Sequence, residues 1–192
     1  MSWWSTIQAT GSALGVLKPV ARPVGCSLGR TIYRETRRAT TIANVRRKAR
    51  PLTPTTQAIL RRLFPDLDVG AIRVRDGCRL PPNRFDLDGD ILAMTFGTNI
   101  FWAGPLDESK PRDLVNLFHE VVHVDQVRRL GGQDGFACAY GTGYVRGGGE
   151  VPASIRTPTA YHRNPLEAEA YRFEAQFQDE AGRVRPERIP RP

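Results

Sequence analysis

Two histidines and a glutamate in this sequence have the spacing needed for metal-dependent hydrolysis. They form the motif His119-Glu120-Val121-Val122-His123, in a chain that has only 3 histidines among 192 residues. Residues four apart on a helix share one face, so both imidazoles can bind one Zn²⁺ ion at ~2.0–2.1 Å. Glu120 projects about 100° away from His119, where its carboxylate can act on a water beside the metal. The motif therefore predicts a zinc cofactor held by the histidines, with Glu120 as the catalytic base.

A catalytic zinc site also needs a third protein ligand and one open position. The longer form of the motif, with a third histidine six residues after the second, is absent because Arg129 stands there. The candidates further along the chain are three acids and the last histidine: Glu150, His162, Glu167 and Glu169. We favour Glu167, because the small Ala170 one turn later would let its helix approach the first helix closely. Glu169 and His162 remain alternatives.

The segments around these residues have clear helix and strand patterns. Apolar residues recur at helical spacing from Pro111 to Leu130, and Gly131-Gly132 predicts the end of that helix. A second helix is expected to begin at Pro165, and an earlier one at Pro54, which follows Thr53 as N-cap. We expect strands over residues 69–75 and 91–102, the latter as a strand pair or one bent strand. Residues 131–160, rich in Gly, Pro, Ser and Thr, predict a long irregular loop.

Charge is distributed unevenly along the chain. The net charge is +8, from 28 Lys and Arg against 20 Asp and Glu. Residues 1–50 contain 10 of the basic residues and only one acid, Glu35, which leaves 18 basic and 19 acidic residues in the remainder. We therefore divide the chain into a basic N-terminal arm (1–50), helical or partly disordered, a folded domain (51–182) and an extended C-terminal tail (183–192). The arm could dock on a partner, whereas the near-neutral domain does not favour nucleic acid.

Cysteine content and hydropathy limit the possible locations and cofactors. Cys26, Cys78 and Cys138 are 52 and 60 residues apart, without a C-x-x-C pair, so we expect buried thiols rather than a disulfide framework or a thiolate zinc site. The apolar stretch from Ile7 to Leu17 is shorter than the ~20 residues that a membrane helix needs. The sequence also predicts no classical signal peptide, and so either a cytoplasmic protein or export by a non-classical route.

Three passages resemble a known family: Met94 to Phe101, Leu117 to Gln126, and Asn164 to Ala170. Through them the chain resembles the gluzincin-like metallopeptidases, and more narrowly the metallopeptidase core domain associated with bacterial extracellular contractile injection systems. The resemblance extends over roughly residues 69–174. It implies an α+β, zincin-like fold: a small twisted sheet, an active-site helix that carries the motif, and a second helix that supplies a glutamate ligand.

The resemblance also implies how a substrate would bind. The strand within Ile91 to Trp102 would be the sheet edge along which a peptide lies, and a further donor would stabilise the oxyanion. The candidates for that donor are Tyr161, His162, Tyr140 and Tyr144. The leading hypothesis is thus a zinc metalloendopeptidase acting on a protein or peptide. The alternative is a zinc-stabilised, non-catalytic interaction module of a bacterial secretion or phage-like assembly, with the basic arm as its docking segment.

Overall fold

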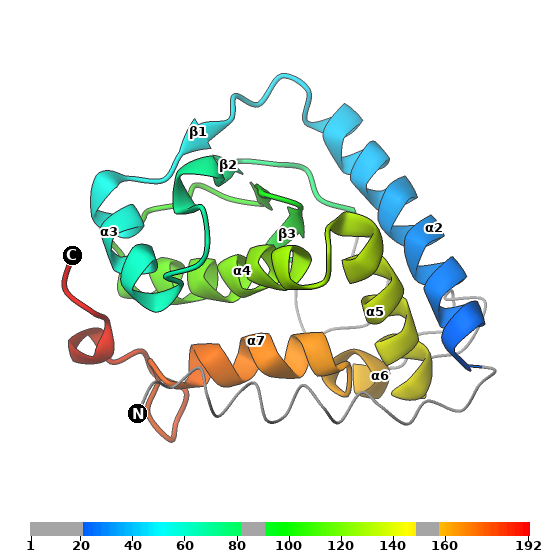
Figure 1. Cartoon of the computed structure of the whole chain (residues 1–192). Helices are drawn as coiled ribbons and strands as arrows, with labels where there is room; N and C mark the ends of the chain where they lie inside the picture. Colours follow the sequence, from blue (N-terminus) through cyan, green and yellow to red (C-terminus); the bar gives the residue numbers. More distant parts are fainter. Residues whose placement is uncertain (1–20, 82–90, 149–157) are drawn as a thin grey trace.

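The computed structural model describes residues 21–81, 91–148 and 158–192 (Figure 1). The described part contains six α-helices and one four-stranded sheet. The helices are α2 (Ala21–Ala43), α3 (Pro54–Leu63), α4 (Pro111–Arg129), α5 (Gln133–Arg146), α6 (Pro158–His162) and α7 (Pro165–Ala175). The strands are β1 (Arg50–Pro51), β2 (Arg73–Arg75), β3 (Ala93–Phe96) and β4 (Asn99–Trp102). This confirms the predicted mixture of helices with a small sheet, but of the strand predicted over residues 69–75 only Arg73–Arg75 form β2, while Val69–Ala71 form a short 3₁₀ helix.

The sheet is small and mixed, with strand order β1-β2-β4-β3. β2 and β4 are parallel and pair Val74 with Ile100, whereas β3 and β4 form an antiparallel hairpin that pairs Met94 with Phe101. Gly97 turns the hairpin with a φ of 64°, a conformation that glycine adopts without strain. The predicted strand pair within residues 91–102 is confirmed, and β3 lies at one edge of the sheet.

Helix α4 lies at the centre of the molecule, between the sheet and α7 (Figure 1). Twelve of its nineteen residues are buried, including a run from Val121 to Val127. Valine is a poor helix former, so this helix depends on packing from several sides rather than on intrinsic propensity. Phe118 and Trp102, both nearly inaccessible to solvent, belong to the core that joins α4 to the sheet and to α7. The motif is therefore carried by one of the most constrained elements of the fold.

Helices α2 and α5 pack unusually closely side by side along one flank of the molecule (Figure 1). A Cβ atom at Gly29 would lie 2.0 Å from the carbonyl oxygen of Ala137, and one at Gly141 would lie 2.2 Å from that of Gly25. The prediction of an irregular loop over residues 131–160 is wrong for Gln133–Arg146, which form α5. Gly141 of α5, a residue type typical of loops, is required here because the backbones of the two helices touch.

The two close-packed helices are also joined covalently. Cys26 of α2 forms a disulfide with Cys138 of α5, across 112 residues of sequence. The expectation of three free thiols is therefore wrong for this pair, while Cys78 is free and buried as predicted. The spacing of the cysteines along the chain does not reveal that two helices bring the pair together.

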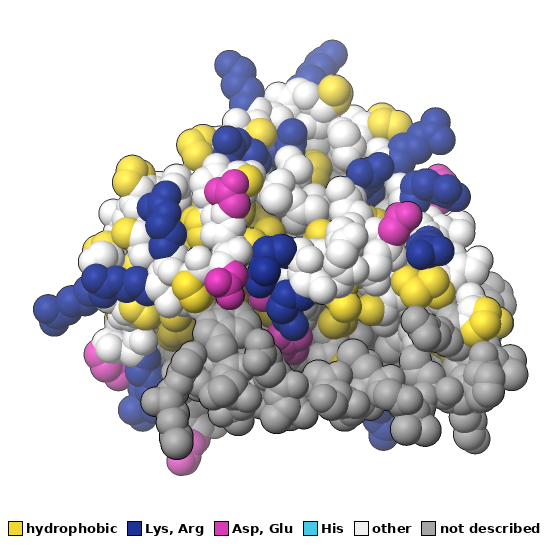
Figure 2. Space-filling view, viewed as in Figure 1, with side chains coloured by type: hydrophobic (Ala, Val, Ile, Leu, Met, Phe, Trp, Pro, Cys, Tyr) yellow, Lys and Arg dark blue, Asp and Glu magenta, His cyan; other side chains and the backbone are white. Residues whose placement is uncertain are grey.

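The outer face of α2 carries four of the basic residues of the predicted arm. Arg30, Arg34, Arg37 and Arg38 are all exposed. On the face drawn in Figure 2, Lys and Arg side chains are spread over the surface, with acidic side chains among them. The helical form predicted for the arm applies to Ala21–Ala43, and the domain division at residue 50 remains a prediction. Among the described helices, none has the length and apolar character needed to cross a membrane.

Candidate metal centre

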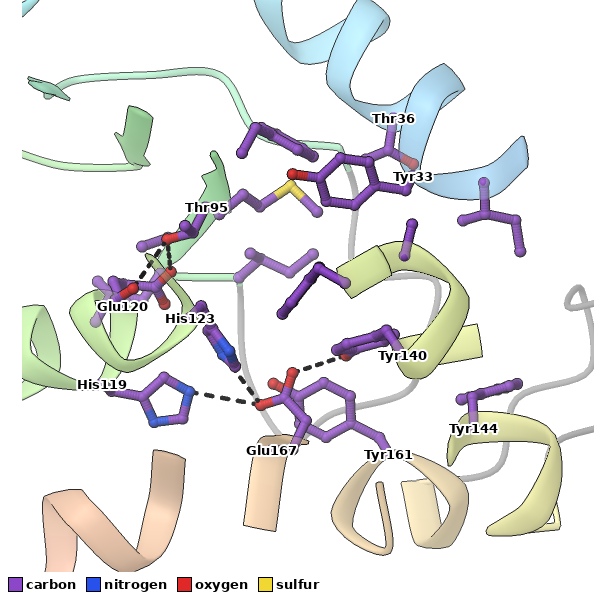
Figure 3. Close-up of a pocket in the computed structure, with 18 of the residues that line it drawn as sticks. Tyr33, Thr36, Thr95, His119, Glu120, His123, Tyr140, Tyr144, Tyr161 and Glu167 are labelled. Carbon is purple, nitrogen blue, oxygen red and sulfur yellow. Dashed lines mark hydrogen bonds and ion pairs between the residues drawn. The ribbon is translucent and has the colours of Figure 1, made fainter. Parts of the chain in front are cut away.

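The structure brings together three of the residues that the sequence assigns to a metal. His119 and His123 lie one turn apart on α4, and Glu167 reaches them from the first turn of α7 (Figure 3). Glu167 Oε2 lies 3.5 Å from His119 Nε2 and 3.6 Å from His123 Nε2. All three side chains are buried, and their candidate ligand atoms lie within 4.8 Å of one another. The arrangement brings Glu167, the favoured third residue, into one group with both histidines, and its role as a metal ligand remains a prediction.

Helix α7 is positioned by its own start signals. Asn164 is its N-cap and accepts a hydrogen bond from the Leu166 backbone N–H, and Pro165 occupies the first turn. Ala170, fully buried, faces the core beside α4. The small side chain at this position permits the close approach of α7 that the sequence predicts, and so lets Glu167 reach the two histidines.

A carboxylate fixes the orientation of His119. Its Nδ1 lies 3.3 Å from Glu174 Oε2, on the same helix as Glu167. A carboxylate can only accept a hydrogen bond, so the imidazole donates from Nδ1. His119 Nε2 is therefore the atom that faces Glu167 and is available to a metal.

Hydrogen bonds through Gln126 fix the second imidazole. The Gln126 amide nitrogen donates to the Leu166 carbonyl and to Glu169 Oε2, which are both acceptors. Its oxygen must then face His123 Nδ1, 2.9 Å away, and accept a hydrogen bond from it. Glu169, an alternative third ligand in the sequence analysis, instead orients the amide and pairs with Arg129. The structure therefore does not support Glu169 as a ligand.

The two oxygens of Glu167 have different surroundings. Tyr140 of α5 donates a hydrogen bond of 2.7 Å to Oε1 (Figure 3). Among the described residues Oε2 is buried without a hydrogen-bond partner, and the Nε2 atoms of the two imidazoles lie 3.5 and 3.6 Å from it. A buried carboxylate oxygen without a donor is costly unless a cation or charged partner compensates it. Glu167 thus presents one anchored oxygen and one oxygen suited to a positive ion.

The electrostatics of the three groups favour a shared positive charge. Burial alone would lower the pKa of His119, but the hydrogen bonds to Glu167 and Glu174 and the nearby carboxylate charges raise it to about 10. Burial would raise the pKa of Glu167, yet the charges and hydrogen bonds of His123 and His119 lower it well below its usual range. The site therefore favours an ionised carboxylate with compensating positive charge.

The donor set fits zinc. Two imidazole nitrogens and one carboxylate oxygen form a usual set for catalytic zinc, and a tetrahedral site with ~2.0–2.1 Å bonds needs ligand atoms about 3.3–3.4 Å apart. The two N···O separations of 3.5 and 3.6 Å are close to that value. Imidazole and carboxylate also bind other divalent metals, so the described geometry defines a group that could hold a metal ion, with a donor set that zinc fits.

No family model, curated protein or solved structure matches this chain. Its function is therefore inferred from the geometry and chemistry of the site.

Glu120 lies beside the three candidate ligands, outside their group. It lines the same cavity of about 610 Å³ as His119 and His123. Thr95 of β3 donates a hydrogen bond of 2.6 Å to its Oε2 (Figure 3). A carboxylate anchored by one oxygen keeps the other available for a proton, which is the arrangement predicted for a general base.

The remaining candidates lie at different distances from the centre. Tyr161 and Tyr144 line the cavity, and Tyr140 holds Glu167 as described. His162 is exposed and packs edge-on against Tyr161, with ring centroids 5.5 Å apart, and does not belong to the candidate metal-binding group. Glu150 lies outside the described residues. His162 is thus not supported as a ligand, and Tyr161 is the better placed of the two favoured oxyanion donors.

Sequence reasoning missed the groups that hold the histidines. Asp125, the polar residue two positions after His123, pairs instead with Arg128 and Arg129. Glu174 could have been found, because it follows Glu167 by seven residues, two helical turns on the same face. Gln126 had a weaker signal, its position three residues after His123 on the same helix.

Proposed function

We propose that this protein is a zinc-dependent, zincin-like metallopeptidase that hydrolyses peptide bonds in a protein or peptide substrate. The observation that carries the proposal is the buried group of His119, His123 and Glu167, with Glu120 beside it in one cavity. A purely structural zinc site is usually closed by four protein ligands, whereas the described residues contribute three. A site with an open position and an adjacent carboxylate suits hydrolysis.

His119, His123 and Glu167 would hold the zinc. When bound, zinc supplies a Lewis acid that polarises a carbonyl and lowers the pKa of water toward about 7. Glu174 and Gln126 keep both Nε2 atoms directed inward, and Tyr140 keeps Glu167 from rotating. These contacts come from three different helices, so the site needs little rearrangement when the metal binds.

Glu120 would perform the proton transfers. Its carboxylate takes a proton from the attacking water and then delivers that proton to the departing amine nitrogen. Thr95, which holds Glu120 Oε2, belongs to the edge strand β3, so the base is positioned relative to the strand along which a substrate would lie. This connection gives the general base a fixed orientation toward a bound peptide.

The edge strand offers a way to align a peptide. Within the described residues β3 pairs only with β4, so no described strand occupies its other edge. An extended peptide can add to such an edge through backbone hydrogen bonds, which are independent of its side chains. The residues of β3 also line the cavity, so a peptide on this edge would pass directly beside the candidate metal site.

Tyr161 is our candidate for the oxyanion donor. Burial, followed by the negative charge of Glu167, raises its pKa well above the usual range. The phenol therefore keeps its proton at neutral pH and can donate a hydrogen bond to an oxygen that becomes negative. Tyr171, in the same cavity, is held protonated by similar causes.

The first test is zinc content. We expect about one zinc per wild-type chain by elemental analysis, and a strong loss of zinc in His123→Ala and Glu167→Gln. Glu35→Gln, at an exposed position on α2, is the matched control and should keep its zinc. Zinc that is absent from the wild type after reconstitution, or that persists in both ligand variants, would refute the site.

The second test is hydrolysis. Glu120→Gln should keep zinc and lose about 10²–10⁴-fold in the rate of cleavage of a fluorogenic peptide library, because a general base contributes that much. Full activity of Glu120→Gln would exclude the mechanism. A chain that binds zinc but cleaves no member of the library would instead favour the non-catalytic interaction module.

A further inference from the structure

The cavity beside the candidate metal site extends away from the metal toward α2. Its volume is about 610 Å³, within the range of sites that bind small molecules or side chains. Figure 3 shows His119, His123 and Glu167 on one side and Tyr33 and Thr36 of α2 on the other. The site is therefore bounded by the N-terminal helix as well as by the two helices that carry the candidate ligands.

The cavity has a charged half and an uncharged half. Among the described lining residues, every charged side chain belongs to α4 or α7; these are Arg112, Glu120, Glu167 and Glu174. The lining residues from α2, β3 and α5 are all uncharged. Several of them are large and apolar: Leu28, Ile32, Met94 and Phe136. A ligand suited to both halves has a polar reacting end and an apolar side chain.

Helix α2 contributes a continuous stripe to the uncharged half. Leu28, Ile32 and Thr36 are spaced four residues apart and so project from one face of the helix. The arginines of the same helix are exposed, for example Arg30 and Arg34. The amphipathic pattern of α2 therefore directs apolar side chains toward the cavity.

This wall is fixed before any ligand arrives. The Tyr33 hydroxyl accepts a hydrogen bond of 3.1 Å from the Gly97 backbone N–H, at the β3–β4 turn. The Tyr33 ring packs edge-on against Phe96 and Phe136, and the disulfide joins α2 to α5. A preformed apolar wall binds an apolar group well, because little conformational entropy is lost on binding.

From these observations, and resting on the proposed function, we infer that the α2 half of the cavity is a specificity pocket that takes a large apolar side chain of the substrate next to the cleaved bond. Leu28, Ile32 and Thr36 are the specificity-determining residues on α2. The substrate class is accordingly a peptide with a large aromatic or aliphatic residue at that position, while charged residues there are disfavoured because the uncharged half has no ion to pair with them.

Two hydroxamates test this inference on the full, zinc-loaded chain. Acetohydroxamate and 4-phenylbutanohydroxamate share one metal-binding group, and only the second carries a large apolar extension. Burying the phenyl ring should make the second compound bind about 10- to 100-fold more tightly by isothermal titration calorimetry. Similar affinities of the two compounds for zinc-loaded wild type would overturn the pocket and leave the metal site intact.

Variants of α2 locate the effect. Ile32→Trp should fill the pocket and bring the ratio of the two affinities close to one, while zinc content and acetohydroxamate affinity stay as in the wild type. Ile42→Trp, on the same helix at a side chain that is 63% exposed and outside the cavity, is the matched control and should keep the ratio. Ile32→Ala, which introduces no bulk, should lower 4-phenylbutanohydroxamate affinity about threefold or more.

The outcomes separate this inference from the proposed function. An unchanged ratio in both Ile32 variants would overturn the assignment of the α2 wall, even if zinc and hydrolysis are as proposed. A wild-type chain that binds no zinc would overturn the proposed function. It would also overturn the specificity pocket, because the pocket rests on that function. A zinc-loaded chain that shows the ratio but cleaves no peptide would support an apolar ligand pocket beside the metal and overturn its role in peptide cleavage.

Discussion

Replacing Tyr140 with phenylalanine removes one hydroxyl group from the candidate metal centre and leaves the ring. That hydroxyl donates a 2.7 Å hydrogen bond to Oε1 of Glu167, whose side chain is only 4% exposed. A hydrogen bond to a charged group contributes about 1.5–3 kcal/mol, and each 1.4 kcal/mol corresponds to a factor of about ten in affinity. Because the unanchored carboxylate can turn away from the histidines, we expect Tyr140→Phe to weaken zinc binding about 10- to 100-fold, as loss of an outer-shell partner usually does.

Competition with a chromophoric zinc chelator at neutral pH measures this effect directly on the full chain. Tyr33→Phe is the control, because it removes a hydroxyl from the opposite end of the same cavity, where it accepts a hydrogen bond from Gly97. The control should keep wild-type zinc affinity. Circular dichroism should show that both variants are folded. Zinc affinity of Tyr140→Phe within twofold of wild type, or an equal loss in Tyr33→Phe, would refute the role of this hydroxyl.

Three further predictions concern the scaffold. Gly29→Ala should lower the free energy of unfolding by at least about 1–3 kcal/mol, because the new methyl group meets the backbone of α5, and urea denaturation measures the loss. Cys26→Ser should lower the free energy of unfolding by about 2–5 kcal/mol, because it removes the disulfide with Cys138. If a reductant leaves the urea unfolding transition of the wild type unchanged, the Cys26–Cys138 bond is contradicted. Glu108→Gln should lower the free energy of unfolding by about 1.5–3 kcal/mol at pH 7. Burial opposes ionisation of Glu108, but the hydrogen bonds from Arg50 and the neighbouring threonines lower its pKa in the folded protein. The stabilisation by ionised Glu108 is therefore fully present above its unfolded-state pKa of about 4.3. It disappears as the pH falls through the lower, folded-state pKa. Thermal melts of both proteins between pH 7 and pH 3 should therefore converge at low pH.

The parts of the site that could be predicted depend on local sequence. Four-residue spacing places His119 and His123 on one face of any helix, and the helix itself is indicated by its apolar pattern and its terminal glycines. The start of α7 is encoded by Asn164 and Pro165, and so the position of Glu167 on its first turn follows as well. The preference for Glu167 over Glu169 and His162 as the third ligand rests on one small residue, Ala170, which lets the two helices approach each other.

The contacts that orient the ligands depend on which helices meet, and local pattern does not show this. Glu174 reaches His119 only because α7 lies along α4, and Tyr140 reaches Glu167 only because α5 closes the other side. Polar residues such as these resemble solvent-facing residues in the sequence. Their role becomes visible only when the helices around them are placed.

Helix α5 shows how tertiary structure can reverse a local signal. Its three interior glycines, at 135, 141 and 143, each disfavour a helix by about 1 kcal/mol relative to alanine, so a sequence pattern alone indicates a loop. At Gly141 the absence of a side chain lets α2 and α5 approach until their backbones touch, and the Cys26–Cys138 bond joins the two helices. Because this contact holds the stripe of Leu28, Ile32 and Thr36 against the cavity, Gly141, one of the glycines that obscure α5 in the sequence, also helps to set the shape of the pocket beside the candidate metal. A substitution at Gly141 should therefore alter hydroxamate preference as well as stability, whereas a loop glycine such as Gly182, with nothing within 4 Å of its Cβ position, should alter neither the cavity nor its preference.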